Sequence, residues 1–342
     1  MSELLNALEL DHEEWTEHCT RELELPRYRA DQICQWIYQK KVFTFSEMTN
    51  LSKDLRKKLE EEIMVFPPYE IQRQVSNIDS TTKYLWGLKD GERIESVTLL
   101  HGNHTTACIS SQVGCPLGCS FCATGKSGFA RNLSTDEITG QFLSMEKNLG
   151  QNINNIVFMG MGEPLLNMEN VKKSIRILNH AKMRDLGIRH ISVSTAGIVP
   201  GIQELASSGL PVRLSVSLHA PNDEIRNRIM PVNRQYPLAS LMGALENYQE
   251  VTGERITIEY IMLKNINDQT EHAFELASLL GNLHTYINLI PYNPVDNKYQ
   301  RSDKKQIKNF HAVLASLGIE AEIRTEKGTD IDAACGQLRR KH

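Results

Sequence analysis

Three cysteines in one short segment are the residues of this chain most able to do chemistry. Cys115, Cys119 and Cys122 have the spacing C-x3-C-x2-C, so a single loop can direct three thiolates to one point. A [4Fe–4S] cluster normally takes four cysteine ligands, and a structural zinc ion takes four Cys or His ligands. The loop runs on without a nearby fourth ligand, which would leave one iron open to bind another molecule. The spacing therefore predicts a catalytic iron–sulfur cluster.

A structural zinc site is the main alternative for this loop. Such sites usually combine two C-x2-C or H-x3-H halves, and the sequence contains no second half. The cysteine spacing, with Phe121 directly before the last cysteine, resembles the signature of the radical S-adenosylmethionine (SAM) superfamily. The resemblance implies that the open iron binds the amino and carboxylate groups of SAM, and that electron transfer then yields a 5′-deoxyadenosyl radical.

Composition indicates a globular protein of a reducing compartment. The chain has 342 residues with 40% hydrophobic content, enough for one large α/β domain and a small companion. Seven cysteines, three of them in one loop, argue against a disulfide framework. The acidic start of the sequence and the lack of a long apolar run predict no signal peptide and no membrane span, so we expect a cytoplasmic protein. A net charge of −4 does not indicate a polyanionic partner.

The pattern of apolar residues divides the chain into three parts. Residues 11–64 show helical spacing, most clearly over 28–38 and 51–59. Near residue 66 the pattern becomes extended, with turns at 89–91 and 101–103. We therefore expect a helical accessory domain at 1–65, a β-rich extension at 66–104, and a core with a C-terminal segment at 105–342.

The core alternates β-rich runs with amphipathic helices, which predicts a parallel sheet. The expected strands are 106–112, 155–159, 190–194, 212–217, 255–262 and 286–290, with a trailing strand at 319–324. A Ser134–Glu137 capping box should open the first helix. Six βα units predict an α/β fold with a partial (βα)6 TIM-like barrel, whose working residues lie at the carboxyl ends of the strands.

Polar side chains do follow these strand ends. Glu163 and Pro164 come after the second strand in a Gly-Met-Gly-Glu-Pro segment that is similar to the glycine-rich SAM-binding motif of the superfamily. Ser194 ends the third strand, Ser217-Leu218-His219 ends the fourth, and Asn293 follows the sixth. Taken alone, each of these residues would more often be a satisfied structural group than a ligand.

Two further cysteines stand apart from the loop. Cys108 lies in the first core strand and, by itself, would be a small apolar core residue. Cys335 lies in the polar segment Thr329-Asp-Ile-Asp-Ala-Ala-Cys-Gly-Gln-Leu338, where a thiol can act as a nucleophile if its pKa is lowered.

Long stretches of the chain resemble the RlmN/Cfr family of RNA methyltransferases, in particular its RlmN branch. The resemblance rests on ISSQVGC, GMGEPLLN, VSTAGIVP, SLHAPNDEIR, NLIPYNP and DIDAACGQL and covers nearly the whole length. It implies that Glu163, Pro164, Ser194, Ser217, Leu218, His219 and Asn293 bind SAM. It also implies that Cys335 becomes S-methylcysteine, that Cys108 is its thiol partner, and that Glu95 is the general base. On the sequence alone, Glu95 would be a solvent-facing strand residue.

The resemblance implies a reaction that uses two SAM molecules, a low-potential electron donor such as flavodoxin or ferredoxin, and a thiol reductant. The first SAM methylates Cys335. The second yields a radical that takes hydrogen from the S-methyl group, so that the carbon adds to C2 of adenine. Release would require loss of the C2 proton and attack by Cys108 on the Cys335 sulfur, giving a disulfide.

The implied substrates are an adenosine of large-subunit ribosomal RNA and an adenosine next to the anticodon of tRNAs. Nothing in the sequence indicates an oligomer, and we expect a monomer by default. A base modified in this way must be unstacked. The accessory domain and the basic groups Lys40-Lys41, Arg56-Lys57-Lys58, Lys126 with Arg131, and Arg339-Arg340-Lys341 are candidate RNA contacts.

Three alternatives remain open at this point. The Cfr branch methylates C8 of the same adenine, and Pro164 favours the C2 branch because the C8 branch has alanine there. A non-catalytic iron–sulfur RNA-binding module would not need an open cluster site or two further placed cysteines. A radical SAM enzyme acting on a small molecule is compatible with the cysteine loop but not with the DIDAACGQL segment.

Overall fold

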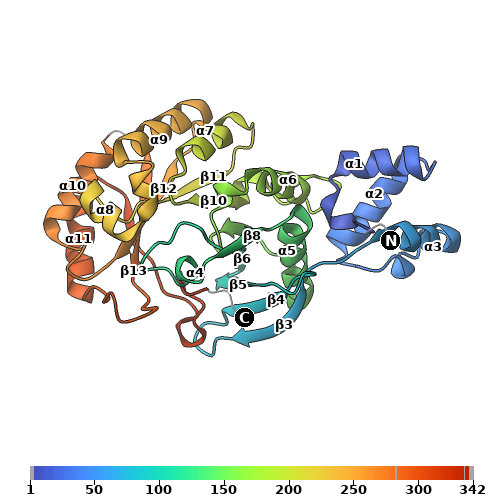
Figure 1. Ribbon diagram of the computed structural model, residues 1–342, viewed down its shortest axis with the longest axis horizontal. Coiled ribbons are helices and arrows are strands. Elements are labelled where there is room, and N and C mark those ends of the chain that lie inside the picture. Colours follow the sequence, from blue (N-terminus) through green and yellow to red (C-terminus); the bar gives the residue numbers. More distant parts are fainter. Residues whose placement is uncertain (1–3, 282, 335, 339–342) are drawn as a thin grey trace.

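A ten-stranded sheet, curved into a partial barrel, forms the centre of the computed structural model, which describes residues 4–281, 283–334 and 336–338 (Figure 1). Its strand order is β14-β13-β12-β11-β10-β9-β6-β5-β4-β3. The strands from β6 to β14 run parallel, whereas β5, β4 and β3 continue the sheet in antiparallel pairing. The sheet thus joins a barrel to a flat extension.

Six βα units make up the barrel, as the alternation predicts. The parallel strands are β6 (His104–Cys108), β9 (Asn155–Phe158), β10 (Ile191–Thr195), β11 (Arg213–Ser217), β12 (Ile256–Met262), β13 (Thr285–Pro291) and β14 (Ala321–Ile323). The helices between them are α5 (Thr135–Leu149), α6 (Met168–Asn179), α7 (Val199–Ser207), α8 (Asp223–Ile229), α9 (Leu238–Thr252), α10 (Thr270–Leu280) and α11 (Lys304–Ser316). These helices cover the outer face (Figure 1). The predicted α/β partial-barrel fold is therefore confirmed.

The apolar runs of the strands account for this arrangement. In β12 nearly every residue is buried, as expected for a parallel strand that has a helix layer on one face and the barrel interior on the other. The predicted capping box also starts α5, with the Ser134 N–H donating to the Glu137 carboxylate at 3.0 Å.

The first barrel strand is shorter than predicted. β6 ends at Cys108, and Gln112–Gly114 form a separate strand, β7, which pairs with β8 (Phe129–Asn132) in a two-stranded antiparallel sheet. The predicted 106–112 strand is wrong in its second half because the chain bends there: Ser111 and Gln112 both donate to the Met161 carbonyl, beyond the end of β9. Cys108 is thus the last residue of its strand.

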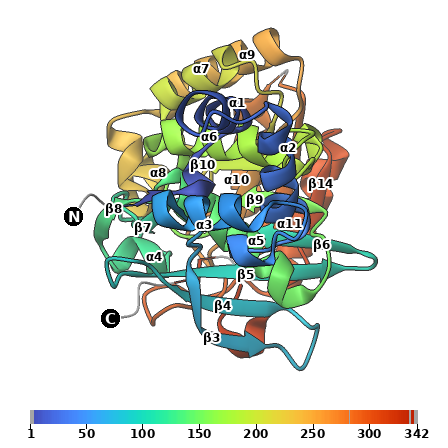
Figure 2. The same ribbon diagram turned by 90° about the vertical axis from the view of Figure 1, so that its right-hand side faces the viewer.

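The antiparallel extension consists of β3 (Tyr69–Val75), β4 (Thr82–Gly87) and β5 (Arg93–His101). Every residue of β4 is buried, whereas most of β3 is exposed at the edge of the sheet. The β3–β4 hairpin lies at one end of the molecule, next to the C-terminal segment, by which we mean residues 324–334 and 336–338 (Figures 1 and 2). The extension therefore forms a wall beside the barrel opening.

The N-terminal residues form a helical unit against the outside of the barrel (Figure 2). Its elements are β1 (Leu5–Asn6), a 3₁₀ turn (Ala7–Glu9), α1 (His12–Glu17), α2 (Tyr28–Cys34), a 3₁₀ turn (Phe45–Glu47), α3 (Lys53–Glu62) and β2 (Ile63–Met64), and π-helical turns extend α1 and α2 over His18–Glu22 and Gln35–Gln39. The parallel β1–β2 pair is too short to leave a pattern in the sequence. Asn6 donates to Asp136 of α5 at 2.6 Å, and Lys173 of α6 pairs with Glu14 at 2.8 Å. None of the helices in the described part of the chain is long and apolar enough to cross a membrane.

Candidate active site

The cysteine loop projects from the base formed by β7 and β8 and contains one short helix, α4 (Ala123–Lys126). Gly114 has a φ of +79°, and a Cβ atom there would lie 1.9 Å from the Gly128 carbonyl oxygen. The Cys115 N–H donates to that same oxygen at 2.9 Å. Glycine at position 114 thus lets the two ends of the loop meet and turns the cysteines toward the barrel.

All three loop cysteines line one cavity at the carboxyl ends of the barrel strands, which we call the cysteine cavity. Four of the predicted SAM-binding residues line the same cavity: Glu163, Ser194, Ser217 and His219. Each comes from the loop or strand end after β9, β10 or β11, so the parallel topology brings together residues that lie far apart in the sequence.

The chemistry of these thiols fits an iron–sulfur cluster. Burial raises the pKa of Cys115 to about 12 and that of Cys119 well above its ordinary value, although both side chains remain partly accessible from the cavity. Thiols in this environment stay protonated unless a strongly cationic group takes the place of the protons. No three His, Cys, Asp or Glu residues among those described are close enough to bind a single metal ion. Three thiols around one cavity suit a cluster that leaves one of its irons without a protein ligand.

Glu163 is a buried acid whose carboxylate accepts hydrogen bonds from two different loops. Its side chain is only 2% exposed; one oxygen accepts from the Leu165 N–H at 3.1 Å and the other from the Ala196 N–H at 2.7 Å. Burial raises its pKa to about 7, and these hydrogen bonds oppose the shift. A buried carboxylate beside an open cavity favours a cationic ligand group, such as the ammonium of a methionine moiety.

The raised pKa of Glu163 predicts that SAM binding weakens in acid. Its pKa of about 7 lies above the ordinary 4.5, so the folded protein carries the carboxylate above pH 7 and the neutral acid below it. Because the neutral acid does not attract the SAM ammonium, affinity is full above pH 7 and falls as the pH drops. We expect the apparent Kd to rise roughly tenfold between pH 8 and pH 6, measured by calorimetry on cluster-loaded protein.

Glu163→Gln is the control for this pH effect. It should bind SAM weakly at every pH, and its thermal unfolding temperature should fall, because an amide presents only one oxygen to the two backbone donors now bound. An equally steep pH dependence in this variant would assign the titration to another group.

His219 is held as a neutral hydrogen-bond donor. Burial and the nearby Arg226 lower its pKa to about 3. Its Nδ1 accepts from the Ile261 N–H at 3.1 Å, which leaves the proton on Nε2. Phe121 packs edge-on against the imidazole, with ring centroids 5.0 Å apart. The aromatic residue before the last cysteine therefore orients a donor from another strand.

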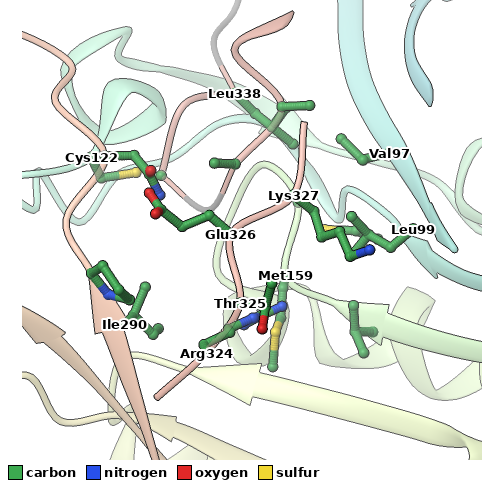
Figure 3. Close-up of a pocket in the computed structure, with 18 of the residues that line it drawn as sticks. Val97, Leu99, Cys122, Met159, Ile290, Arg324, Thr325, Glu326, Lys327 and Leu338 are labelled. Atoms are coloured by element: carbon green, nitrogen blue, oxygen red, sulfur yellow. The ribbon is translucent and has the colours of Figure 1, made fainter. Parts of the chain in front are cut away.

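A second cavity adjoins the first, and we call it the Cys108 cavity (Figure 3). Both cavities are lined by Cys122, Met159, Gly160, Ile290, Arg324 and Gly336. Cys108, Val97 and Leu99 form one side of the second cavity, and the C-terminal segment forms the other. Cys335 lies outside the described residues, but its neighbours Ala334 and Gly336 both line this cavity.

Lys83, Glu95 and Cys108 have their side chains on one face of the sheet, where the antiparallel extension meets β6. Lys83 of β4 pairs in register with Val97 of β5, which pairs with Cys108 of β6, so all three side chains share a face. Glu95, two residues before Val97, points to the same side. Glu95 is 1% exposed, so its interpretation as a solvent-facing residue is wrong. The C-terminal segment packs on this face, which no pattern within β5 could reveal.

Some predicted residues do not reach the cysteine cavity. Asn293 lines the Cys108 cavity only, while Pro164 and Leu218 are buried and line neither of the two. Pro164 begins the 3₁₀ turn Pro164–Leu166 directly after Glu163. Leu218 donates its N–H to the Glu259 carbonyl at 3.1 Å. These two positions shape the loops that carry the cavity residues.

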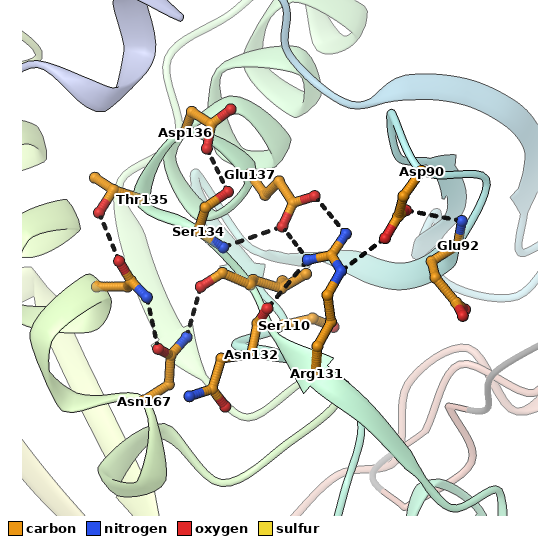
Figure 4. A network of polar contacts seen from close by, with 12 residues as sticks. Asp90, Glu92, Ser110, Arg131, Asn132, Ser134, Thr135, Asp136, Glu137 and Asn167 are labelled. Atoms are coloured by element: carbon orange, nitrogen blue, oxygen red, sulfur yellow. Dashed lines mark hydrogen bonds and ion pairs between the residues drawn. The ribbon is translucent and has the colours of Figure 1, made fainter. Parts of the chain in front are cut away.

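Several basic groups expected at an RNA surface are committed to ion pairs. Arg131 makes a two-pronged contact with Glu137 at 2.7 and 2.8 Å and also pairs with Asp90 at 2.7 Å (Figure 4). Lys126 pairs with Asp296. Lys41 is largely buried and lies 3.4 Å from the buried carboxylate of Glu146. The segment Arg339-Arg340-Lys341 lies outside the described residues.

Glu259 is a cavity residue that the sequence analysis missed. It is 3% exposed, lines the cysteine cavity, accepts from Asn288 at 2.9 Å and lies 3.7 Å from Arg324. Burial raises its pKa, and Arg324 and Asn288 oppose that rise. The available signal was a lone acid within the apolar strand Ile256–Met262. Burying a carboxylate in such a strand is costly unless it is paired or hydrogen-bonded, so its presence indicates a specific partner.

Arg226 was missed as well, although it belongs to the SLHAPNDEIR stretch. It is fully buried and donates to the carbonyls of Leu218 and Ala196 at 3.1 and 2.6 Å. It therefore ties together the loops that follow β10 and β11, both of which border the cysteine cavity.

Comparison with known proteins agrees with this geometry. Residues 109–277 match the family model described as the radical SAM superfamily, and residues 5–65 match the ribosomal RNA large subunit methyltransferase N-terminal domain. Proteins named probable dual-specificity RNA methyltransferase RlmN from Thermosipho melanesiensis and Thermotoga maritima are 53% and 52% identical over 336 residues, covering 98% of this chain and 98% of each relative.

A solved structure is similarly close. The crystal structure of a radical SAM methyltransferase from Sphaerobacter thermophilus matches with a TM-score of 0.94 and 40% identity, covering 98% of this chain and 99% of that one. The similarity spans the accessory unit, the extension and the barrel together. The chain therefore belongs to the RlmN family of radical SAM RNA methyltransferases.

Proposed function

We propose that this enzyme methylates C2 of an adenosine in large-subunit ribosomal RNA and of an adenosine next to the anticodon in tRNAs. The observation that carries the proposal is the shared wall between the cysteine cavity and the Cys108 cavity. A methyl donor bound in the first cavity would lie beside the C-terminal segment and a base held in the second. The printed names of the relatives, which are dual-specificity RNA methyltransferases, support the choice of RNA.

The cysteine cavity would hold the cofactors. Cys115, Cys119 and Cys122 would bind a [4Fe–4S] cluster, and Glu163, Ser194, Ser217 and His219 would bind SAM. When bound, the cluster and SAM supply the methyl group and the radical chemistry of a 5′-deoxyadenosyl group. The chain contributes Glu163 as the anion facing the ammonium and His219 as a neutral donor. Apolar side chains such as Phe121 exclude water from this space.

The residues of the Cys108 cavity would handle the RNA base. Cys335 would carry the methyl group delivered by a first SAM, and a second SAM would be consumed in activating it. Glu95, which lines neither cavity but lies two residues before the cavity residue Val97 on β5, would take the proton that leaves C2. Cys108 would then attack the Cys335 sulfur, breaking the carbon–sulfur bond and forming a disulfide that a thiol reductant reopens. The released carbon would take up a proton to become the methyl group of the base, and the unpaired electron left on the ring by the radical addition would pass to the external redox partner. The largely apolar walls, including Val97, Leu99 and Met159, suit a flipped-out adenine.

The remaining parts of the proposal concern partners. Residues 1–65 would be an RNA-contacting accessory domain, 66–104 a β-rich extension, and 105–342 the radical SAM core with the catalytic-cysteine segment. We propose that the enzyme is a cytoplasmic monomer that receives electrons from a low-potential donor such as flavodoxin or ferredoxin.

Mass spectrometry of the RNA product tests the proposal. The reconstituted enzyme is incubated without oxygen with SAM, a reductant and unmodified large-subunit ribosomal RNA, and in parallel with unmodified tRNA. The RNA is then digested to nucleosides. We expect new 2-methyladenosine in both. If 8-methyladenosine forms instead, the proposed position is wrong; if SAM is cleaved and no methyladenosine forms, the proposed substrates are wrong.

A further inference from the structure

Lys83 is a buried lysine at the centre of the antiparallel extension, outside the set of residues assigned to the reaction. Its side chain is 6% exposed, and its Nζ lies 3.9 Å from a carboxylate oxygen of Glu95, whose side chain is 1% exposed. The same Nζ donates to the Asp332 carbonyl at 3.2 Å. Burying an ammonium group is costly unless it is paired and hydrogen-bonded, so these two contacts account for its presence here.

Lys83 connects Glu95 with a segment that lies more than two hundred residues further along the chain. Through the strand register it shares a face with Val97 and Cys108, and Glu95 lies diagonally opposite on the neighbouring strand. Asp332 belongs to the C-terminal segment, only three residues before Cys335. One ammonium group therefore contacts both the candidate base and the segment that carries the candidate methyl carrier.

The C-terminal segment has other anchors besides Lys83. Gly328 donates its N–H to Asp79 at 2.9 Å, and Asp330 accepts from the Asn77 N–H at 3.0 Å, so the β3–β4 turn also holds the segment. On the opposite side, the Ala123 N–H donates to the Gly336 carbonyl at 2.8 Å. With these three anchors retained, loss of the Lys83 contact should leave the path of the segment largely unchanged.

Glu95 depends more strongly on Lys83. Burying a carboxylate is costly unless a nearby positive charge compensates for the lost solvent, and such a partner also fixes the orientation of the carboxylate. Lys83 provides that charge from a neighbouring strand, and β4 is buried along its whole length, so its position is rigid.

We propose that Lys83 is a positioning residue that holds the Glu95 carboxylate in one orientation and in register with the cysteine-bearing segment. The inference rests on the proposed function, in which Glu95 removes the C2 proton after the carbon from Cys335 has joined the base. Lys83 itself lines neither the cysteine cavity nor the Cys108 cavity. Its effect should therefore appear at the proton-removal step and not at the methylation of Cys335 or at SAM cleavage.

Three variants separate these steps: Lys83→Met, which removes the charge at similar length, Lys83→Arg, which keeps it, and Lys89→Met, which removes an exposed charge from the same extension. For each, peptide mass spectrometry measures S-methylcysteine at position 335, chromatography measures 5′-deoxyadenosine, and a denaturing gel measures enzyme covalently joined to RNA. We expect Lys83→Met to keep the first two within about twofold, to accumulate the covalent species, and to lose methyladenosine at least roughly tenfold, less than the roughly hundredfold or greater loss typical when a general base itself is removed. Lys83→Arg should recover much of the product, and Lys89→Met should behave as wild type.

A double-variant cycle shows whether Lys83 acts through Glu95. If it does, Lys83→Met combined with Glu95→Gln should form product no more slowly than Glu95→Gln alone, because the second change removes an interaction already lost. The double variant also replaces a buried ion pair by two neutral side chains, so it provides a folded protein even if Lys83→Met alone unfolds.

The outcomes separate this proposal from the proposed function. If wild-type enzyme forms no methyladenosine, the proposed function itself fails. If wild type is active and Lys83→Met lowers S-methylation, SAM cleavage and product equally, Lys83 has only a structural role and the proposal is overturned. Normal product formation by Lys83→Met, additive losses in the cycle, or absence of the covalent species in Glu95→Gln would each overturn it as well.

Discussion

Cys108→Ala is expected to convert the enzyme into a trap for its RNA. Cys108 ends β6, is 8% exposed and lines the cavity that the neighbours of Cys335 also line. In the proposed function its thiol attacks the Cys335 sulfur. Without that thiol the carbon bridge between the protein and the base cannot be broken. We expect released 2-methyladenosine to fall by at least about a thousandfold, as for loss of a nucleophile. A protein species carrying RNA should appear on a denaturing gel and resist thiol reductants.

Cys335→Ala is the matched control, because it removes the other thiol of the pair. It should abolish methylation equally but form no covalent species, since no sulfur remains to carry the carbon. Both variants should therefore lack methylation activity, but only Cys108→Ala should show the covalent protein–RNA species on a denaturing gel. Normal turnover in either variant, or a covalent species in both, would contradict the assigned roles. The alanine at position 108 leaves the strand intact, because the β5–β6 pairing uses backbone groups.

Cys119→Ala is expected to abolish both iron binding and SAM cleavage. The backbone of Cys119 is held within the loop: its carbonyl accepts from the Cys122 N–H at 3.1 Å, and Gly125 packs directly against its backbone. Alanine preserves those backbone contacts and removes only the sulfur. Two cysteines cannot replace the three that the open cluster needs, so iron content after reconstitution and 5′-deoxyadenosine formation should both fall to background.

Cys34→Ala controls for the general effect of removing a buried cysteine. Cys34 is fully buried in the accessory unit, where burial raises its pKa well above the ordinary value and keeps it an inert thiol. This variant should keep the iron content and SAM cleavage of wild type, with at most a small decrease in unfolding temperature. Full iron loading of Cys119→Ala would show that the cluster ligands lie elsewhere.

Much of the fold was predictable because the barrel depends on local patterns. Apolar runs bounded by turns placed the strands β9 to β13 within one or two residues of their observed bounds. The same signal failed for the second half of the predicted strand 106–112, because β6 ends at Cys108 and Gln112 begins β7, which pairs with β8 in another sheet. A period of two shows that a strand forms but not with which strand it pairs, because pairing depends on the path of the whole chain.

The residues of the candidate site were likewise predictable from the sequence only in part. The sequence by itself determined the three-cysteine loop, the acid after β9 and the unusual surroundings of Cys335, because each is a matter of residue type and spacing within one segment. Only the tertiary structure decided that Glu95 is buried beside Lys83, that Asn293 faces the Cys108 cavity, that Glu259 lines the cysteine cavity, and that Arg226 joins the loops after β10 and β11. These facts depend on segments that meet across the sheet, because the burial and charge environment of a side chain come from whatever packs on its face. Lys83, the partner of Glu95, contacts a segment more than two hundred residues away in the sequence.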